Sequence, residues 1–391
     1  MRIGVDATTW FNGRGYGRFT RELLPELCAA GSAHEFVLFV DAGHAAELRL
    51  PRDNVRVRAV VCDAAPTAAA AADGYRSPRD LLRFSAAARS ERTDAFFFPT
   101  VYSYFPLFPA RGVVVTVHDT IAERFPELTL PSRRARLFWK AKVALALFQA
   151  RIVLTVSDYS AREITSRLGV APARLRVTCE APSPVYGHDT SADEQRRAAT
   201  ACGVSAGARW FTYVGGFNPH KRVDALVRAH AAVAKDAAEA PHLLLVGTID
   251  KDVFHGCRAD LVRLIDELGT KELVHWTGFV DDERLRALHA GAVACVLPSE
   301  CEGFGLPAVE AAAAGTAVVA TRESPLPELL AGGGHFVAPG DDAALTGALR
   351  SLLADEPDRA ARARAACRAA RALSWRRSAE VALAAIEEAA A

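Results

Sequence analysis

The 391-residue chain lacks a strong excess of charge of either sign. It holds 47 Lys and Arg residues against 46 Asp and Glu, a formal net charge of +1, and the basic residues are spread along the chain rather than gathered in a tail. A protein that binds nucleic acid mainly through phosphate contacts carries a basic patch or stripe. The composition therefore argues against a nucleic-acid partner.

Paired cysteines and long apolar runs are also missing. The eight cysteines are scattered without a Cys-x-x-Cys pair, which fits neither a zinc site nor a compact disulfide framework and agrees with reduced thiols in a cytosol. No apolar run approaches the roughly 20 residues of a membrane-spanning helix. The segment Met1 to Asp6 reads as a first strand rather than a signal peptide. We expect a cytoplasmic protein, attached at most peripherally to the inner face of a membrane.

Short apolar strands alternate with longer helical segments along the whole chain. This is the pattern of doubly wound parallel sheets in an α/β protein, and the length suits two domains of about 200 residues each. Predicted helices include residues 18–29, 78–89, 132–149 and 160–168. Predicted strands are residues 3–5, 36–40, 55–60, 95–98, 113–117, 152–156 and 176–178 in the first half, and 210–214, 242–246, 273–276, 294–297 and 317–320 in the second.

A composition change separates the two predicted sheets. The stretch from Glu180 to Gly207 is rich in Pro, Asp, Ser and Gly and has no long apolar run. We therefore place a linker at residues 186–207, between an N-terminal domain of residues 1–185 and a C-terminal domain of residues 208–373.

The most informative segment runs from Glu300 to Glu310. Glu302 precedes a glycine-flanked turn, Pro307 suits the first turn of a helix, and Glu310 falls about one turn inside that helix. The free backbone N–H groups of a helix start favour an anion such as a diphosphate, which glycines allow to approach closely. Two glutamates eight residues apart also recur by chance, as one loop residue and one helix-surface residue. The residues between and beside the two glutamates therefore decide the interpretation.

The string from Pro298 to Pro307, within a Glu-x7-Glu pattern, resembles the signature of retaining glycosyltransferases of family 4. The resemblance covers nearly the whole chain and implies the GT-B architecture, two Rossmann-like domains facing each other across a cleft. It implies that residues 374–391 form a helix that returns to the N-terminal domain. It also implies a nucleotide-diphosphate sugar donor on the second domain, an acceptor on the first, and transfer without a cofactor, a metal or an enzyme nucleophile.

The resemblance assigns roles within this segment. Glu310 is expected to bind the ribose hydroxyls of the donor, whereas Glu302 is a catalytic candidate that holds the transferred sugar. The other donor-binding residues expected in the segment are Gly303, Phe304, Gly305 and Leu306.

A second donor-binding segment opens the C-terminal half, where a strand is followed by the turn from Gly215 to Lys221. Lys221 is expected to reach the donor phosphates as a mobile point charge, although an exposed lysine at a helix start has the same pattern. Many relatives place an arginine where this chain has Gly216. Either the Gly216 backbone N–H takes part of that role, or a basic residue such as Arg14 or Arg18 contributes from the first domain.

A glycine-rich stretch, Gly13 to Arg18, opens a helix in the first half. It lies about eight residues past the first strand and is not Gly-x-Gly-x-x-Gly, so it is a poor dinucleotide fingerprint. It is similar to the loop that lies near the donor phosphates and acceptor in family 4. Gly15, Gly17 and Arg18 are therefore candidates for an acceptor or phosphate loop, with a flexible turn and a surface arginine as the alternative.

His118 and Asp119 follow another predicted strand. The string Thr116 to Ile121, with Arg-Phe-Pro-Glu close behind at residues 124–127, resembles mannosyltransferase-like members of the family. A histidine at the edge of a sheet can bind a sugar hydroxyl or act as a base near neutral pH, but a lone histidine is more often structural. His118 is a catalytic candidate, and Asp119 either joins the site or caps the next turn.

Two further segments have competing interpretations. Asp250-Lys-Asp252 matches the Asp-x-Asp metal pattern of other glycosyltransferases, but the intervening lysine would compete with a cation, which favours a solvated loop and no metal site. The basic and aromatic residues of 133–142 suit either an amphipathic membrane-binding face or, as we favour, a domain helix with Leu137, Phe138 and Val143 buried.

We therefore predict a retaining hexosyltransferase that moves a sugar from GDP-mannose or a UDP-sugar to a sugar or glycolipid acceptor in glycan biosynthesis. A dehydrogenase would show Gly-x-Gly-x-x-Gly directly after a strand and an acidic residue about 20 positions further on, and the chain shows neither. A sugar-nucleotide-binding protein without turnover is the remaining alternative, although such a protein is expected to lose the carboxylates that this chain keeps.

Overall fold

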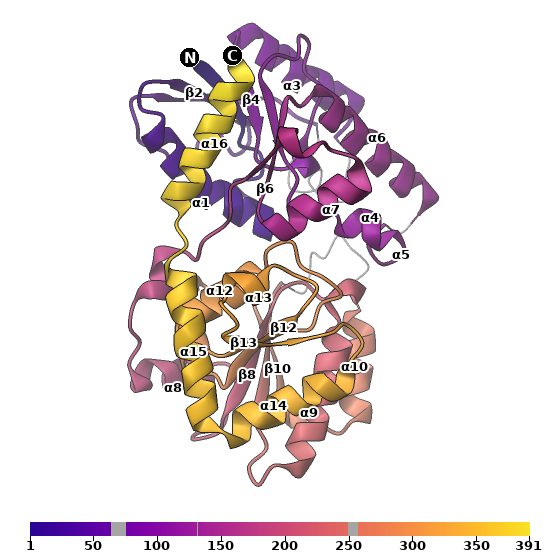
Figure 1. Ribbon diagram of the computed structural model, residues 1–391, viewed down its shortest axis with the longest axis vertical. Coiled ribbons are helices and arrows are strands. Elements are labelled where there is room, and N and C mark those ends of the chain that lie inside the picture. The colour runs from indigo at the N-terminus through magenta and orange to yellow at the C-terminus, as the bar shows by residue number, and fades with distance from the viewer. Residues whose placement is uncertain (64–75, 131, 249–256) are drawn as a thin grey trace. The chain divides into compact units, whose positions relative to one another are not determined.

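The computed structural model describes residues 1–63, 76–130, 132–248 and 257–391 (Figure 1). They form two compact units. The first contains Met1–Glu180 and Ser374–Ala391, and the second contains Ala181–Leu373. The chain thus passes from the first unit to the second after Glu180 and returns at Ser374.

The first unit is built on a seven-stranded sheet in the order β3-β2-β1-β4-β5-β6-β7, with parallel pairs throughout. Central strands are buried along nearly their whole length, as expected for a parallel sheet covered on both faces. Its strands are β1 (Arg2–Asp6), β2 (Glu35–Asp41), β3 (Val55–Val60), β4 (Ala95–Phe98), β5 (Val113–Thr116), β6 (Ile152–Thr155) and β7 (Leu175–Val177).

The helices of this unit connect the strands and cover the sheet. Several begin at a side-chain cap, such as Ser157 before α7. They are α1 (Gly15–Ala30), α3 (Pro78–Glu91), α4 (Ile121–Arg124), α5 (Pro126–Thr129), α6 (Arg133–Gln149), α7 (Asp158–Leu168) and α16 (Trp375–Ala390), with short 3-10 turns at Val101–Ser103 and Pro172–Arg174.

The second unit repeats this plan with a six-stranded parallel sheet in the order β10-β9-β8-β11-β12-β13. Its strands are β8 (Trp210–Val214), β9 (His242–Val246), β10 (Val274–Gly278), β11 (Ala294–Leu297), β12 (Val318–Thr321) and β13 (Gly334–Val337). Its helices are α8 (Ala192–Thr200), α9 (Val223–Asp236), α10 (Arg258–Glu267), α11 (Asp282–Gly291), α12 (Leu306–Ala313), α13 (Leu326–Leu329), α14 (Asp342–Ala354) and α15 (Glu356–Arg371), with 3-10 turns at Pro184–Gly187, Pro219–Lys221 and Lys271–Leu273.

The prediction of two parallel α/β sheets is confirmed. The edge strand β13 was not predicted, because its Gly-rich approach reads as a loop. These glycines allow close packing: a Cβ at Gly333 would lie 2.5 Å from the backbone nitrogen of Ala366 in α15, and one at Gly334 would lie 3.0 Å from the carbonyl oxygen of Val318 in β12.

The predicted linker at residues 186–207 is wrong. This segment belongs to the second unit and contains α8, which packs on α11. Ser191 caps α8 by accepting from the backbone of Glu194, whose carboxylate accepts in turn from the backbone of Ser191. This capping box marks a helix start, which the polar composition of the segment obscured.

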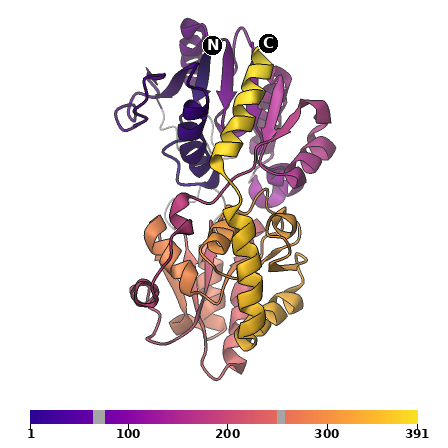
Figure 2. The same cartoon turned by 60° about the vertical axis from the view of Figure 1, so that its left-hand side comes forward.

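The C-terminal helix α16 packs against α1 and the strands β4 to β7 of the first unit. Figures 1 and 2 show this yellow helix beside the indigo N-terminal segments. Its packed face consists of Trp375, Ile386 and small side chains, which let the helix approach closely. Thr178 donates from Oγ1 to the carbonyl oxygen of Ser378 at 2.7 Å.

Helix α6 differs from its predicted packing. Trp139 and Val143 are buried, but Leu137 and Phe138, which were expected to share the buried face, are exposed. The helical period accounts for the difference, because residues 139, 143 and 146 lie on one face and residues 137 and 138 point away from it.

Candidate functional site

The second unit offers a ligand site at the edge where its strands end. Its chain runs from β8 outward to β10 and then returns to β11 on the other side of β8. Ligands of open parallel sheets bind beyond the strand ends at such a switch point. The segments that follow β8 and β11 are those that contain Lys221 and Glu302, so the fold brings the two predicted motifs to one place.

Lys221 and Glu302 form a direct ion pair. The Nζ of Lys221 lies 2.8 Å from Oε1 of Glu302, and the hydroxyl of Ser299 donates to the same oxygen at 2.6 Å. The backbone N–H of Glu302 donates to the carbonyl oxygen of Glu323, which follows β12. Three strand ends therefore fix one carboxylate beside one ammonium group.

The turn from Gly303 to Gly305 opens α12 as predicted. Gly305 precedes the helix with a φ of +84°, and a Cβ there would lie 2.8 Å from the Leu326 side chain. Both constraints favour glycine. Pro307 occupies the first turn of α12, and Phe304 and Leu306 are buried beneath this turn.

Glu310 is the fifth of the eight residues of α12 and is 4% exposed. The rest of α12 is Leu, Pro, Val and Ala, so this carboxylate stands on an otherwise apolar helix. A buried carboxylate is costly unless it serves an interaction. Its place one turn from the glycine turn agrees with a ligand-binding role rather than a helix-surface glutamate.

Arg222 joins the site, although the sequence analysis did not single it out. Its Nη1 lies 2.9 Å from Oε1 of Glu300 and its Nη2 lies 3.4 Å from Oδ1 of Asp342. The residue adopts a left-handed φ of +50°, which is uncommon for arginine. The Arg222–Glu300 ion pair links the turn after β8 to the turn after β11. In the sequence, Arg222 directly follows Lys221, and Glu300 stands two residues before Glu302. These adjacent charges were the signal that could have identified Arg222.

His220 contributes no second positive charge beside Lys221. Burial, with a smaller contribution from the Lys221 charge, lowers the pKa of His220 to about 3, so its ring is neutral near pH 7. Its carbonyl oxygen accepts from the backbone N–H of Glu300 at 2.8 Å. At Gly216, the carbonyl oxygen accepts from the hydroxyl of Tyr213 and holds the turn after β8.

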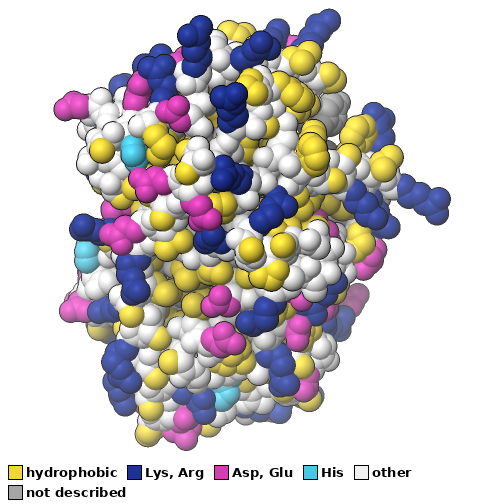
Figure 3. Space-filling model, turned by 45° about the horizontal axis from the view of Figure 1, so that its top comes forward, with side chains coloured by type: hydrophobic (Ala, Val, Ile, Leu, Met, Phe, Trp, Pro, Cys, Tyr) yellow, Lys and Arg dark blue, Asp and Glu magenta, His cyan; other side chains and the backbone are white. Residues whose placement is uncertain are grey.

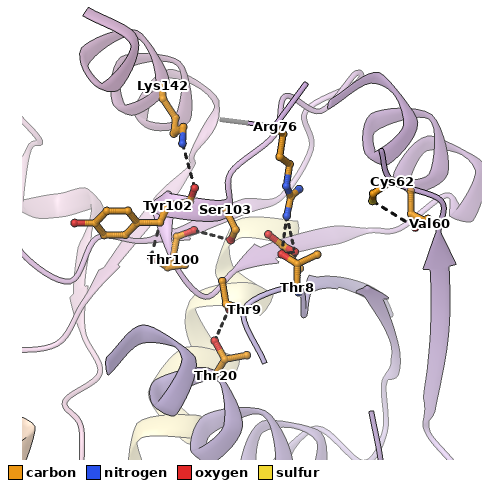
Figure 4. Close-up of polar contacts among 11 residues, drawn as sticks. Thr8, Thr9, Thr20, Val60, Cys62, Arg76, Thr100, Tyr102, Ser103 and Lys142 are labelled. Carbon is orange, nitrogen blue, oxygen red and sulfur yellow. Dashed lines mark hydrogen bonds and ion pairs between the residues drawn. The ribbon is translucent and has the colours of Figure 1, made fainter. Parts of the chain in front are cut away.

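The first unit has its own switch point between β1 and β4. Hydroxyl groups follow both strands, as Figure 4 shows for Thr8 and Thr9 after β1 and for Thr100 and Ser103 after β4. Thr8 donates to Oδ1 of the buried Asp6 at 2.7 Å. These four hydroxyl-bearing residues are buried, so they form a polar layer inside this edge of the sheet.

Two basic side chains point toward this edge from other elements (Figure 4). Arg76 donates to the Oγ1 of Thr8 at 2.6 Å and lies over the ring of Phe84 at 4.2 Å. Lys142 of α6 donates to the carbonyl oxygen of Tyr102 at 3.2 Å. Burial, with a smaller contribution from the Arg76 charge, lowers the pKa of Lys142 to about 8. Sequence analysis placed neither residue at this edge, because Arg76 lies in no recognised motif and Lys142 was considered only as part of the basic segment 133–142.

The glycine-rich stretch lies beside this edge. Gly15 begins α1, and a Cβ at Gly17 would lie 2.0 Å from the carbonyl oxygen of Asn12, so only glycine fits there. Between them, the ring of Tyr16 stacks on that of Tyr102 with centroids 5.2 Å apart. Burial raises the pKa of Tyr16 to about 12, against the opposing effect of Arg14. Arg18 is half-buried on α1.

His118 is held by protein groups on both sides of its ring. Its Nε2 lies 3.0 Å from the carbonyl oxygen of Pro99, and its Nδ1 lies 3.5 Å from Oε1 of the buried Glu180. Phe19 contacts the ring edge to face. This geometry favours a positioning or hydrogen-bonding role over that of a free base, since both nitrogens face acceptors.

Asp119 caps the next turn, because its Oδ1 accepts from the backbone N–H of Ile121 at 2.9 Å. The prediction that Asp119 caps the next turn is therefore confirmed, and its place in the acceptor or phosphate site stays a prediction. The Asp250-Lys-Asp252 tripeptide lies outside the described residues. Within residues 1–63, 76–130, 132–248 and 257–391, no group of three or more His, Cys, Asp or Glu side chains is arranged to hold a metal ion.

Relatives of the chain agree with this architecture. It is 31% identical over 250 residues to O-antigen chain mannosyltransferase B of Escherichia coli, covering 62% of this chain and 61% of that protein. It is 34% identical over 208 residues to the MMP alpha-(1->4)-mannosyltransferase of Mycolicibacterium hassiacum, covering 52% and 46%. The matched regions thus span about half to three fifths of those relatives. The structure of Anabaena Alr3699/HepE, in complex with UDP-glucose, superposes with a TM-score of 0.71 at 19% identity and covers 99% of this chain and 98% of that one.

The two parallel-sheet units and this structural match define a protein of the GT-B fold. The family model for Glycosyltransferase Family 4 matches residues 13–179, and the model for Glycosyl transferases group 1 matches residues 203–369. The chain belongs to glycosyltransferase family 4, whose members are retaining, metal-independent transferases.

Proposed function

We propose that the protein transfers a hexose, with retention, from a nucleotide-diphosphate sugar to a sugar or glycolipid acceptor. The single observation that carries the proposal is the Lys221–Glu302 pair at the switch point of the second unit, with the buried Glu310 eight residues further along the chain in α12. An ammonium group, a sugar-binding carboxylate and a second carboxylate for the ribose match the three parts of such a donor.

In the proposed reaction the acceptor hydroxyl attacks the anomeric carbon from the face that the diphosphate leaves, and a phosphate oxygen takes its proton. The protein then acts by positioning and charge stabilisation. Lys221 stabilises charge on the departing diphosphate, Glu302 with the 303–305 backbone orients the sugar, and Glu310 binds the ribose. The start of α12 adds backbone N–H groups to the phosphate site.

We propose that the acceptor binds to the first unit, at the switch point between β1 and β4. The half-buried, stacked rings of Tyr16 and Tyr102 provide an aromatic surface of the kind that packs on sugars, and the buried side chains of Thr8, Thr100 and Ser103 lie at the same edge. Gly15, Gly17 and Arg18 border it, with His118 as a positioning residue.

A mannosyl donor is our specific proposal. The similarity to two mannosyltransferases supports it, as does the His118–Asp119 and Arg124–Glu127 string. The pathway we propose is polysaccharide or glycoconjugate synthesis on the cytoplasmic side of a membrane. GDP-mannose and UDP-sugars are the donors to compare.

A donor panel tests this proposal. Release of GDP or UDP from GDP-mannose, UDP-glucose, UDP-galactose and UDP-N-acetylglucosamine would be measured with mannose-terminated oligosaccharides, with and without excess chelator. We expect turnover with GDP-mannose, unchanged by chelator and by Asp252→Ala. Donor binding without turnover on any acceptor would instead support a sugar-nucleotide-binding protein, and chelator-sensitive turnover restored by magnesium would refute metal-independent chemistry.

A further inference from the structure

Two loops of the first unit meet where the neighbouring strands β1 and β2 end. One loop follows β1 and contains Phe11, and the other follows β2 and contains His44. The rings of Phe11 and His44 stack, with centroids 4.9 Å apart and an interplanar angle of 28°. Both residues are half-buried, so the aromatic pair is open to solvent on part of its surface.

Asp41, the last residue of β2, fixes the ring of His44. The backbone N–H of His44 donates to the carbonyl oxygen of Asp41 at 3.2 Å and closes a turn. Within the same turn, Nδ1 of His44 donates to Oδ1 of Asp41 at 2.8 Å, because a carboxylate accepts hydrogen bonds. Nε2 is then left for a partner outside this pair, and the described residues of the chain supply no hydrogen bond to it.

The carboxylate of Asp41 is costly as a purely structural group. The residue is 5% exposed, and its Oδ2 is buried without a hydrogen-bond partner among the described residues. Burial of a polar atom costs free energy unless the atom is bonded, and most buried polar atoms in native proteins are bonded. A neutral asparagine or serine would close a turn as well. Orientation of the His44 ring is therefore the role that accounts for the carboxylate.

The loop that carries Phe11 is held by α1. Arg21 of this helix donates from Nη1 to the carbonyl oxygen of Trp10 at 2.6 Å and to that of Asn12 at 2.7 Å. These two residues stand on either side of Phe11. The aromatic pair is therefore built before any ligand binds, and preorganised contacts lose less entropy on binding.

The same loop leads to the aromatic surface proposed for the acceptor. Asn12, the residue after Phe11, forms a side-chain hydrogen bond with Tyr16, whose ring stacks on that of Tyr102. One loop thus joins two aromatic pairs in succession. A sugar ring packs its apolar face on an aromatic ring and hydrogen-bonds through its hydroxyl groups, so two successive pairs match two neighbouring sugar units.

Exposed apolar side chains alone do not identify a site on this chain. Figure 3 shows hydrophobic side chains interspersed with charged ones over the visible face, which is the ordinary condition of a protein surface. Among the described residues, no helix has the length and apolar character needed to cross a membrane. The Phe11–His44 pair differs from scattered apolar residues because a buried carboxylate fixes one of its two rings.

We propose that Phe11 and His44 form a second acceptor subsite, which binds the sugar unit preceding the one that receives the hexose. The ring of that sugar would pack on the aromatic pair. Nε2 of His44 would hydrogen-bond with one of its hydroxyl groups, which can donate or accept. Asp41 is a positioning residue, because it acts through His44. The acceptor is then a glycan chain of at least two sugar units.

The second subsite depends on the proposed function, because it extends the proposed acceptor site. Binding of a free disaccharide requires neither donor nor turnover, whereas nucleotide release tests the transferase. Failure of the subsite and failure of the proposed function are therefore separately observable.

Acceptor length tests the subsite. Methyl glycosides of mannose, glucose and galactose would be compared with disaccharides that end in each of these sugars. Binding to the full chain would be followed by saturation-transfer NMR without donor, and KM and kcat would be measured with each donor of the panel. We expect saturation transfer to both rings of the preferred disaccharide, and a KM about tenfold below that of its methyl glycoside, because one ring contact and one hydrogen bond are added.

Three variants test the residues of the subsite. His44→Ala should raise the KM for the disaccharide about tenfold, toward the value for the methyl glycoside, because the contact with the second unit is lost. Phe11→Ala should do the same and should lose saturation transfer to the second ring. Asp41→Asn keeps an oxygen that accepts from Nδ1 of His44 and should retain most of the preference, whereas Asp41→Ala should match His44→Ala.

His34→Ala is the matched control. Nε2 of His34 lies 2.8 Å from Oε1 of Glu387, the same separation as in the His44–Asp41 pair. His34 directly precedes β2 instead of following it, so it lies at the opposite edge of the sheet. The control should leave the ratio of the two KM values intact, and thermal unfolding of every variant would show whether a change in that ratio reflects lost stability.

Equal KM values of the wild type for disaccharide and methyl glycoside would overturn the proposal. Absence of saturation transfer to the second ring would overturn it too. If His44→Ala raised both KM values to the same extent, or His34→Ala changed their ratio as strongly, His44 would be a support of the loop and not a contact of the second sugar unit.

Discussion

The ammonium group of Lys221 and the carboxylate of Glu302 form an ion pair with a separation of 2.8 Å, and both side chains are largely buried. In the proposed donor complex, the same ammonium group would face the diphosphate. In that case the carboxylate of Glu302 would compete with the donor for Lys221 until the sugar occupied Glu302.

Exchange of Lys221 for alanine should weaken nucleoside diphosphate binding by about ten- to a hundredfold, as expected for loss of a charge-assisted contact. Glu302→Gln should leave that affinity unchanged or raise it, because the competing charge is removed, while turnover falls. Calorimetric titration with GDP and UDP measures both. Weakened diphosphate binding in Glu302→Gln would show that the pair does not compete in this way.

The Glu310→Ala variant should lose measurable donor binding. A carboxylate that bridges two ribose hydroxyls contributes roughly 1.5–3 kcal/mol for each charge-assisted hydrogen bond. Its melting temperature should be equal to or above that of the wild type, because a buried carboxylate is replaced by a small apolar group. Affinity for the nucleoside diphosphate within about twofold of the wild type would remove Glu310 from the site.

His118→Ala should lower kcat while leaving nucleotide affinity nearly intact, because the proposed positioning role of His118 belongs to the acceptor side in the first unit, whereas the nucleotide binds to the second. The ring also bridges Pro99 and Glu180, so the variant should lose some stability. Glu180→Gln, which removes only the carboxylate charge next to Nδ1, separates the two effects. Near-normal turnover of the alanine variant, or a loss of nucleotide binding as large as in Lys221→Ala, would show that His118 is misplaced.

Lys142 should make stability depend on pH above neutrality. Burial, aided by the Arg76 charge, lowers its pKa from 10.5 to about 8 in the folded state. Between pH 8 and 10.5 the unfolded chain holds the additional proton, so folded stability rises with pH across this window. Below pH 8 both states are protonated, and the cost of the buried charge, about 3 kcal/mol, is present in full.

Comparison of Lys142→Met with wild type isolates that cost. The stability of the variant relative to wild type should be greatest at pH 7 and should decline toward pH 10, measured by urea unfolding at several pH values. Lys140→Met is the control, because Lys140 is exposed on the same helix. A difference between Lys142→Met and wild type that stays constant over this range would contradict a lowered pKa.

Periodicity was sufficient to predict both sheets apart from the edge strand β13, and the family resemblance assigned Lys221 and Glu302 to one donor site. Buried parallel strands are short apolar runs between helices, so they are visible in the sequence, and their polar ends meet by topology alone. The edge strand β13 was not predicted because the glycines at its start serve close packing, Gly333 against α15 and Gly334 against β12. Such packing is a tertiary property without a local signal.

The remaining discrepancies have similar causes. Arg76 lies in no recognised motif and Lys142 was considered only within the basic segment 133–142, so only the folded chain places both at the edge of the first sheet. Leu137 and Phe138 were expected in the core but are exposed. Helix α6 has two apolar faces, and hydrophobicity alone does not identify which of the two is covered.

The return of α16 to the first unit has a consequence for synthesis and dissection of the protein. The helix covers part of the β4 to β7 region and packs on α1, yet it follows the entire second unit in the chain. On the ribosome, the second unit can therefore complete its fold while the first still exposes the apolar surface that Trp375 and Ile386 later cover. Expression of residues 1–180 alone should produce an aggregation-prone fragment, whereas fusion of residues 374–391 to its end through a flexible linker should restore a soluble unit.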